Sequence, residues 1–319
     1  MNADRFPRDL TTTALADAPR GAERADSGLS IAVVVATTGR PRTSRLTLDR
    51  LARQTRAPDR VLVVAVTPDD IAELDQAKIA VETYFAPRGL CRQRNRALAI
   101  LDGRSDLVIF FDDDFVAADD YLENAERLFL RHGDIAGATG RVIADGINGR
   151  GIAFEEAEAI LAADTHTPLG ERIMRPKRGL YGCNMVFRLA AIGDLTFDEN
   201  LPLYGWQEDV DFSYRLKGRG RLVECDTIAG VHMGEKIGRT SGRRLGYSQI
   251  ANPLYLLEKG SIPRDLAWRI MRNNVTSNIW GSIMPEPYID RVGRLIGNLI
   301  AVRDLATRRL DPRRILDLL

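Results

Sequence analysis

The stretch Leu107-Val-Ile-Phe-Phe-Asp-Asp-Asp-Phe115 joins an uninterrupted apolar run to three adjacent carboxylates. The apolar run predicts a buried strand over 107–111 that leads straight into Asp112. A strand that is apolar on both faces is typical of a parallel sheet covered by helices on both sides. Ligands of such sheets bind beyond the carboxyl ends of the strands, where the three aspartates lie.

Strands and helices alternate around this stretch. The pattern predicts further strands at 31–36, 61–66 and 79–85, and helices near 41–55, 71–76, 89–101 and 119–130. We therefore expect an α/β fold: a Rossmann-like, mostly parallel sheet with flanking helices.

Three regions are expected along the chain. Residues 1–30 are rich in Ala, Asp, Arg and Thr and lack an apolar core, which predicts a disordered leader and not a secretory signal. The α/β domain spans 31–257, and 258–319 form a helical C-terminal extension.

Composition narrows the class of protein. The formal net charge of +1 gives no global field that would attract nucleic acid. The three cysteines are far apart and show no CxxC spacing, which argues against a disulfide framework or a thiolate zinc site and fits a reducing compartment. No apolar run approaches the roughly 18 residues of a membrane span. We expect a cytoplasmic protein, with a peripheral position at the inner face of the membrane as an open alternative.

The carboxylates of Asp112, Asp113 and Asp114 repel one another, so burying them is costly without a cation. A hard divalent ion such as Mg²⁺ takes oxygen ligands and is commonly completed by substrate phosphates. We predict metal binding here; a solvated acidic turn in which Asp112 caps the next helix is the alternative.

Gln207-Glu208-Asp209-Val-Asp211 is a second acidic cluster, just before a predicted helix near 210–217. One carboxylate of this cluster is a candidate general base. Helix capping explains the same residues about as well. Trp206 next to them offers a flat face on which a sugar ring could stack, or it belongs to the core.

His232 lies between two glycines, in Gly230-Val-His-Met-Gly234, and not in a helical stripe. A lone histidine is more often structural, yet imidazole is an accepted ligand for Mn²⁺-class ions.

A basic cluster, Arg88 to Arg96, lies at the start of a predicted helix. Backbone N–H groups and arginine forks at such a position favour phosphate, although solvated surface arginines give the same pattern.

In their order along the chain, these segments resemble family 2 of the GT-A glycosyltransferases. The similar segments are Ala36-Thr-Thr-Gly-Arg-Pro41, Gly89 to Asn95, Phe111-Asp-Asp-Asp-Phe115, Tyr181-Gly-Cys-Asn-Met-Val-Phe-Arg188 and Trp206-Gln-Glu-Asp209. The resemblance covers roughly 31–257, which would be the catalytic domain, and it implies a GT-A fold. One departure is Thr67-Pro-Asp-Asp70, where the family usually has a compact acidic-serine turn.

The resemblance implies roles for individual residues. Asp209 would be the catalytic base and Glu208 would orient the base or the acceptor, while Asp114 and His232 would ligate the metal ion, Mn²⁺ or Mg²⁺. The implied donor-binding residues are Thr37, Arg40, Asp69, Arg94, Asn95, Asp112 and Asp113. The implied acceptor-binding residues are Gly182, Asn184 and Trp206.

The implied reaction is transfer of a hexosyl-type sugar, with inversion, from a nucleoside-diphosphate donor to an acceptor hydroxyl in polysaccharide or glycoconjugate synthesis. UDP-sugar is the default donor, and the acceptor is a carbohydrate or a lipid-linked molecule. Two alternatives stay open. One is a sugar nucleotidyltransferase, because Thr38-Gly-Arg-Pro41 faintly resembles the glycine-rich opening loop of that class. The other is a non-catalytic sugar- or lipid-binding protein on a degenerate scaffold.

The tail from Arg291 onward contains seven arginines and three aspartates interleaved with Leu and Ile. It is either an amphipathic helix that contacts an anionic membrane or a surface helix that packs on the catalytic domain or on a second copy. From the sequence alone we favour packing.

Overall fold

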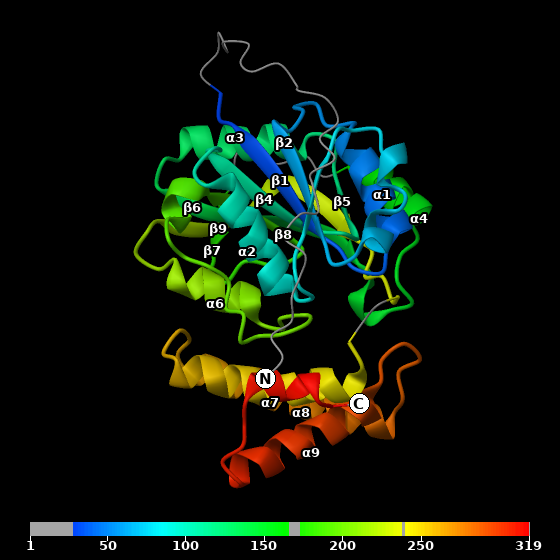
Figure 1. Cartoon of the computed structure of the whole chain (residues 1–319), viewed down its shortest axis with the longest axis vertical. Helices are drawn as coiled ribbons and strands as arrows, with labels where there is room; N and C mark the ends of the chain where they lie inside the picture. Colours follow the sequence, from blue (N-terminus) through cyan, green and yellow to red (C-terminus); the bar gives the residue numbers. More distant parts are fainter. Residues whose placement is uncertain (1–27, 166–172, 238–239, 319) are drawn as a thin grey trace, which may run out of the picture.

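A computed structural model describes residues 28–165, 173–237 and 240–318. Its centre is a nine-stranded sheet in the order β3-β2-β1-β4-β8-β6-β9-β5, with β7 paired to β9 (Figure 1). Helices cover both faces of this sheet, and a separate group of helices lies across one end of it. The predicted α/β fold with flanking helices and a helical C-terminal part is confirmed.

The first half of the sheet is parallel, as the alternating pattern predicts. Its strands are β1 Ile31–Ala36, β2 Arg60–Ala65, β3 Glu82–Phe85 and β4 Leu107–Asp112. β1 pairs with β2 and with β4, so that Ala36 lies beside Asp112 at the carboxyl end. Helices α1 Pro41–Leu51 and α2 Leu90–Leu101 connect these strands.

The second half of the sheet is mixed, which the prediction of a mostly parallel sheet does not describe. Its strands are β5 Phe115–Ala117, β6 Ile135–Asp145, β7 Ile173–Pro176, β8 Asn184–Arg188 and β9 Arg221–His232. β8 runs antiparallel to β4 and to β6, whereas β6 and β9 are parallel to each other. β9 carries His232 as its last residue.

Four further helices belong to this part: α3 Tyr121–Arg131, α4 Phe154–Ala163, α5 Leu189–Ile192 and α6 Glu208–Arg215. Short 3-10 turns η1 Pro68–Ile71, η2 Leu74–Gln76 and η3 Gly146–Asn148 complete the connections. Separate apolar clusters fill the two faces of the sheet, because alternate residues of β1, such as Val33 and Val34, point to opposite sides.

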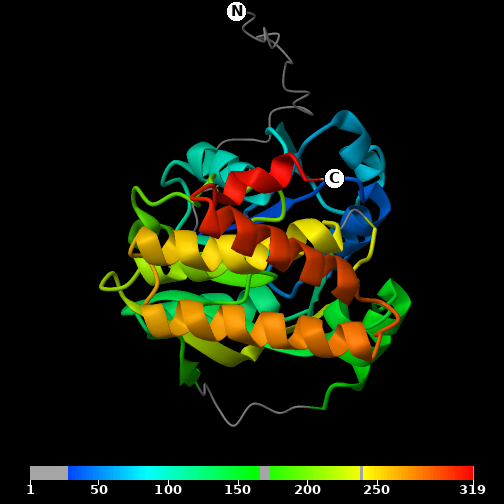
Figure 2. The ribbon, with the colours of Figure 1, turned by 90° about the horizontal axis from the view of Figure 1, so that it is seen from below.

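A helical unit follows the sheet: α7 Gly242–Glu258, α8 Arg264–Ile283, α9 Arg291–Ala306 and η4 Pro312–Leu316. α9 crosses α7 at close range, since a Cβ at Gly246 would collide with the carbonyl of Arg294 and one at Gly297 with the carbonyl of Arg243. Figure 2 shows α9 crossing over α7, with α8 beside α7. Among the described helices, none is both long and apolar enough to cross a bilayer.

The predicted domain limits stay predictions. Of the leader predicted over 1–30, residues 1–27 lie outside the described residues, while Ser30 donates to Asp106 and is joined to the sheet. The limit at 257 falls at the end of α7, a helix that packs on α8 and α9.

Candidate active site

A cleft of about 370 Å³ lies between the carboxyl ends of β1 and β4 and the helical unit. The sheet side contributes Thr37, Arg40, Gln93, Asp112, Asp113, Asp114 and His232. The loop before α6 contributes Tyr204 and Trp206. The helical unit contributes Arg244, Gln249, Asn274 and Arg294. Carboxylates therefore concentrate on the sheet side together with Arg40, and two further arginines lie on the helical side.

Asp113 is held in place by the segment that follows β1. Its Oδ2 accepts a hydrogen bond from the Thr37 hydroxyl at 2.7 Å, and its Oδ1 lies 2.8 Å from Nη1 of Arg40. The Thr47 hydroxyl donates to its carbonyl. Burial raises the pKa of Asp113 to about 7, against the opposing charge of Arg40. Asp113 thus locks the start of α1 to the turn after β4.

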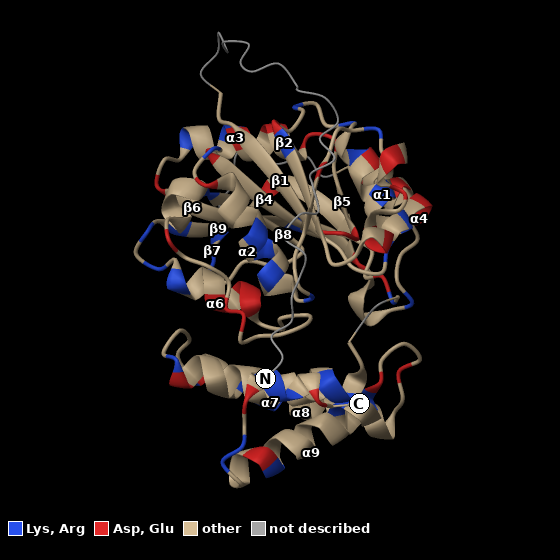
Figure 3. Ribbon diagram, in the orientation of Figure 1, with Lys and Arg blue, Asp and Glu red and all other residues tan. Residues whose placement is uncertain are grey.

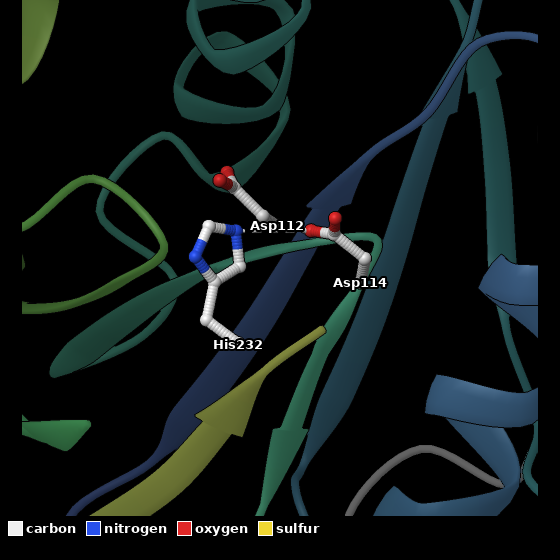
Figure 4. A group of neighbouring side chains, drawn as sticks. All are labelled: Asp112, Asp114 and His232. Atoms are coloured by element: carbon white, nitrogen blue, oxygen red, sulfur yellow. Dashed lines mark ion pairs between the residues drawn. The ribbon is translucent and has the colours of Figure 1, made fainter. Parts of the chain in front are cut away.

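Asp112, Asp114 and His232 converge at the end of β4 (Figure 4). One ligand atom of each lies within 4.8 Å of the other two, and Nε2 of His232 is 3.4 Å from Oδ1 of Asp114. Cis ligands of an octahedral ion stand about 3 Å apart and trans ligands about 4 Å. Two carboxylate oxygens and one imidazole nitrogen at this spacing fit one divalent cation with small movements.

Asp145 orients the imidazole of His232. The two residues are register partners at the ends of the parallel strands β6 and β9, and Nδ1 of His232 lies 2.9 Å from Oδ1 of Asp145. Tyr181 donates to the other oxygen of Asp145 at 2.6 Å. A carboxylate on one imidazole nitrogen leaves the other nitrogen facing a metal, as in many metal sites.

The acidic surroundings determine the charge of His232. Burial lowers its pKa, but hydrogen bonds to Asp114 and Asp145 outweigh that effect and raise the pKa to about 10. For Asp145, burial raises the pKa, yet the bonds from His232 and Tyr181 bring it to about 2. In the absence of an ion, a proton on His232 neutralises part of the cluster.

Arg94 links the two acidic motifs. This fully buried side chain on α2 places Nη1 2.5 Å from Oε1 of Glu208, and its Nη2 donates to Asp112 and to the carbonyl of Gly182. Figure 3 shows the acidic start of α6 beside the arginines of α2. Phe110 and Phe197 flank the guanidinium and exclude water from it. Burial raises the pKa of Glu208, and the charge of Arg94 opposes that shift.

The loop before α6 is strained. Leu203, Gly205 and Gln207 all have φ between +59° and +76°, a region that non-glycine residues rarely adopt. Such strain commonly accompanies functional sites, because the surrounding structure must compensate for it. Here it turns the chain so that α6 begins with Glu208 and Asp209 facing the sheet.

Asp209 is partly exposed and accepts two backbone hydrogen bonds. Gly182 donates to its Oδ2 at 3.0 Å and Val210 donates to its Oδ1 at 2.8 Å. Burial raises the pKa of Asp209, while these two bonds oppose the shift. A carboxylate with a raised pKa that is still reachable from solvent has the properties of a general base.

The comparison with known families agrees with this geometry. Glycosyl transferase family 2 matches residues 32–195, just over half of the chain and the part that carries the aspartate triplet. The chain belongs to glycosyl transferase family 2. No curated protein matches its sequence.

Solved structures with the same fold include two that align over most of this family 2 chain. Residues 1–349 of TarS from S. aureus align at 17% identity with a TM-score of 0.52, covering 91% of this chain and 83% of that one. The mannosyltransferase PcManGT from Pyrobaculum calidifontis, in complex with GDP-Man and Mn²⁺, aligns at 14% identity with a TM-score of 0.51, covering 88% and 76%. A longer TarS structure aligns at 18% identity with a TM-score of 0.47, covering 76% of this chain but only 42% of its own length. At these identities the likeness shows the fold alone.

Seven residues implied by the family resemblance do not line the cleft: Asp69, Arg94, Asn95, Gly182, Asn184, Glu208 and Asp209. Asn184 is fully buried in β8, and its Oδ1 accepts from Gly140 and Thr139 of β6, so this amide is not available to an acceptor. The amide of Asn95 is bound to the backbone of Phe197: its Nδ2 donates to the carbonyl and its Oδ1 accepts from the N–H group. Asp69 is exposed on η1 and does not line the cleft.

Three features of the family 2 site were not predicted from the sequence: the structural role of Asp70, the contribution of Asp145, and the cleft residues of the helical unit. Asp70, next to Asp69, is buried and accepts from the N–H groups of Gly39, Val66 and Thr67, so it fixes the loop after β1. Asp145 ends a strand that the glycine-rich sequence around it does not predict. The cleft residues of α7, α8 and α9 carry no motif, and only folding brings them opposite the aspartates.

Proposed function

We propose that this family 2 glycosyltransferase moves a sugar from a nucleoside-diphosphate donor, with UDP-sugar as the default, onto a hydroxyl of a carbohydrate or lipid-linked acceptor, with inversion. The observation that carries the proposal is the convergence of Asp112, Asp114 and His232 at the carboxyl end of β4, on the wall of a cleft.

Asp112, Asp114 and His232 would hold Mn²⁺ or Mg²⁺. Such an ion, when bound, neutralises charge that develops on a departing diphosphate. The Pyrobaculum relative holds a nucleoside-diphosphate sugar together with Mn²⁺, which supports this pairing of donor and ion. Thr37, Arg40 and Asp113 line the same wall and would contact the donor.

The arginines on the cleft walls support a diphosphate ligand. Arg40 lies beside Asp113 and Asp114, and Arg88, Arg244 and Arg294 line the remaining walls. Guanidinium groups bind phosphate oxygens with two parallel hydrogen bonds and lower the energy of a transition state in which those oxygens gain charge. Helices α7 and α9 would thus contribute to donor binding.

Asp209 would accept the proton of the attacking hydroxyl as its oxygen forms a bond to the anomeric carbon and the diphosphate oxygen leaves. Glu208 lies next to it, and its Oε2 is a buried oxygen with no hydrogen-bond partner among the described residues. A hydroxyl of donor or acceptor would satisfy that oxygen. Trp206 and Tyr204 supply flat faces for a sugar ring, and Gly182 positions Asp209.

A thermal-shift screen of nucleotide sugars, each with and without MnCl₂, tests the proposal. We expect one nucleotide sugar to raise the Tm only when the metal is present, and turnover to release a nucleoside diphosphate. Release of pyrophosphate from a nucleoside triphosphate would identify a nucleotidyltransferase instead. Metal-independent binding without turnover would identify a binding protein.

A further inference from the structure

The outer side of α9 is apolar and exposed. Val292, Ile296, Leu299 and Val302 recur every three or four residues along it, and Leu299 is 63% exposed. The opposite side of the helix packs on α7 around Gly297. The predicted packing of this tail therefore accounts for one side of α9 only and leaves an apolar stripe on the other.

The end of α8 continues this surface. Trp280, Ile283 and Met284 are 67%, 68% and 72% exposed, and the Tyr288 ring in the following turn is also exposed. α8 packs against α9, and both helices run across the end of the molecule, α8 beside α7 and α9 obliquely over it (Figure 2). Single exposed apolar residues are normal on a protein surface, but a continuous group of this kind marks an interaction site.

Arginines lie on the same two helices and directly after α9. Six of them are exposed, and none has an ion-pair partner among residues 28–165, 173–237 and 240–318; they are Arg264, Arg269, Arg272, Arg303, Arg308 and Arg309. Arg269 and Arg272 lie on the same side of α8 as the exposed Trp268. The face thus combines apolar side chains, aromatic rings and cations that no protein carboxylate neutralises.

We propose that the outer face of α8 and α9 binds the surface of an anionic lipid bilayer. The apolar side chains would enter the boundary between headgroups and acyl chains, with Trp268, Trp280 and Tyr288 at headgroup level. The arginines would meet lipid phosphates, each adding to the attraction of a negative surface. A second copy of this chain is a poorer occupant, because a twofold contact would bring the same unpaired arginines together.

The proposal does not depend on the reaction proposed above, but it concerns the same helices. Arg244 of α7 and Arg294 of α9 line the cleft on the inner side of the unit. Where α9 lines the cleft, a bilayer on its outer side would then lie about one helix diameter, on the order of 10 Å, from the edge of the cleft. Any acceptor anchored in the lipid would be held near the carboxylates.

Vesicle co-sedimentation of the full chain tests this proposal. Vesicles are made either of phosphatidylcholine alone or with about one-third phosphatidylglycerol. An apolar variant combines Trp280→Gln, Ile283→Gln and Leu299→Gln; a charge variant combines Arg269→Gln, Arg272→Gln and Arg303→Gln. The matched control combines Leu130→Gln and Arg104→Gln, exposed positions on α3 and before β4, at the end of the sheet away from the helical unit.

We expect the wild type and the control to pellet with anionic vesicles, and each triple variant to bind at least about tenfold more weakly. The charge variant should also show a weaker salt dependence than the wild type, since salt screens exposed charges and three of the six arginines are removed. Because all six positions are exposed, Tm values should stay unchanged. Equal pelleting of wild type and both variants would overturn the proposal. So would a dimer in sedimentation velocity that the apolar variant dissociates, if no form binds vesicles.

Discussion

Arg94 and Glu208 form an ion pair between two almost completely buried side chains, with Nη1 2.5 Å from Oε1. The same guanidinium donates to Asp112 at the end of β4. One cation therefore fixes the distance between the carboxylates proposed to hold the metal ion and those proposed to serve the acceptor.

Replacing Arg94 with Met should destabilise the fold strongly. The substitution leaves Glu208 and Asp112 in a buried site without their counter-ion, and breaking one side of a buried pair typically costs about 3–5 kcal/mol. Urea denaturation measures the change in the free energy of unfolding. Adding Glu208→Gln in the same chain should recover part of the loss, because it removes one stranded charge. A loss below about 1 kcal/mol for Arg94→Met would show that the pair is not structural.

Asp209→Asn should abolish most of the turnover while donor binding persists. Asparagine keeps the size of the side chain but cannot accept the proton, so we expect kcat to fall on the order of 10²–10⁴-fold. Steady-state kinetics and donor calorimetry measure the two properties separately. Asp194→Asn, at an exposed ion pair with Arg219, is the control and should change neither. Near-normal kcat in Asp209→Asn would disprove its role as the base.

Asp145→Asn should weaken metal binding without removing a ligand. Asp145 holds Nδ1 of His232, and loss of such a partner typically lowers metal affinity about 10- to 100-fold. Calorimetric titration of Mn²⁺ gives the affinity of the variant, with His232→Ala as the reference for loss of the ligand itself. An unchanged Mn²⁺ affinity in Asp145→Asn would mean that His232 is oriented by other contacts or is not a ligand.

The stability of the contact between the helical unit and the sheet should depend on pH through the ionisation of Asp198. Burial raises the pKa of Asp198, but hydrogen bonds from Lys259, Asn200 and Tyr255 outweigh burial and lower it. Lys259 and Tyr255 belong to the end of α7. A carboxylate with a lowered folded-state pKa stabilises the fold above its unfolded pKa of about 4, and this contribution disappears as the pH falls through the folded-state value.

We therefore expect Asp198→Asn to lower the free energy of unfolding by about 1–3 kcal/mol at pH 7 and by much less near pH 2. Urea denaturation at several pH values measures this difference between wild type and variant. A difference that stays constant down to pH 2 would mean that the charge of Asp198 does not contribute.

The parallel half of the fold was predictable because each strand there is a continuous apolar run. β1 and β4 are buried on both faces, and their sequences end abruptly in polar residues at the carboxyl edge. That edge then located Asp112, Asp113 and Asp114 without further information. The second half was harder to predict, because β6 contains Gly137 and Gly140 and β8 lies next to a glycine-rich loop.

The glycines of β6 have a structural reason that the sequence does not display. A Cβ at Gly137 would press on Phe187, and one at Gly140 would collide with the carbonyl of Ile228. These residues therefore allow β6 to lie close to its neighbours. The structural roles of Asn184 and Asn95 could not be predicted from the sequence either. An asparagine that binds a ligand and one that binds backbone groups cannot be distinguished by sequence alone.

Anomalous diffraction from a crystal soaked with UDP and MnCl₂ tests the central claim most directly. We predict one manganese peak within about 2.2 Å of a carboxylate oxygen of Asp114 and of Nε2 of His232, with the diphosphate completing the coordination. Density for the nucleotide without a manganese peak, or a peak remote from Asp114, would contradict the account.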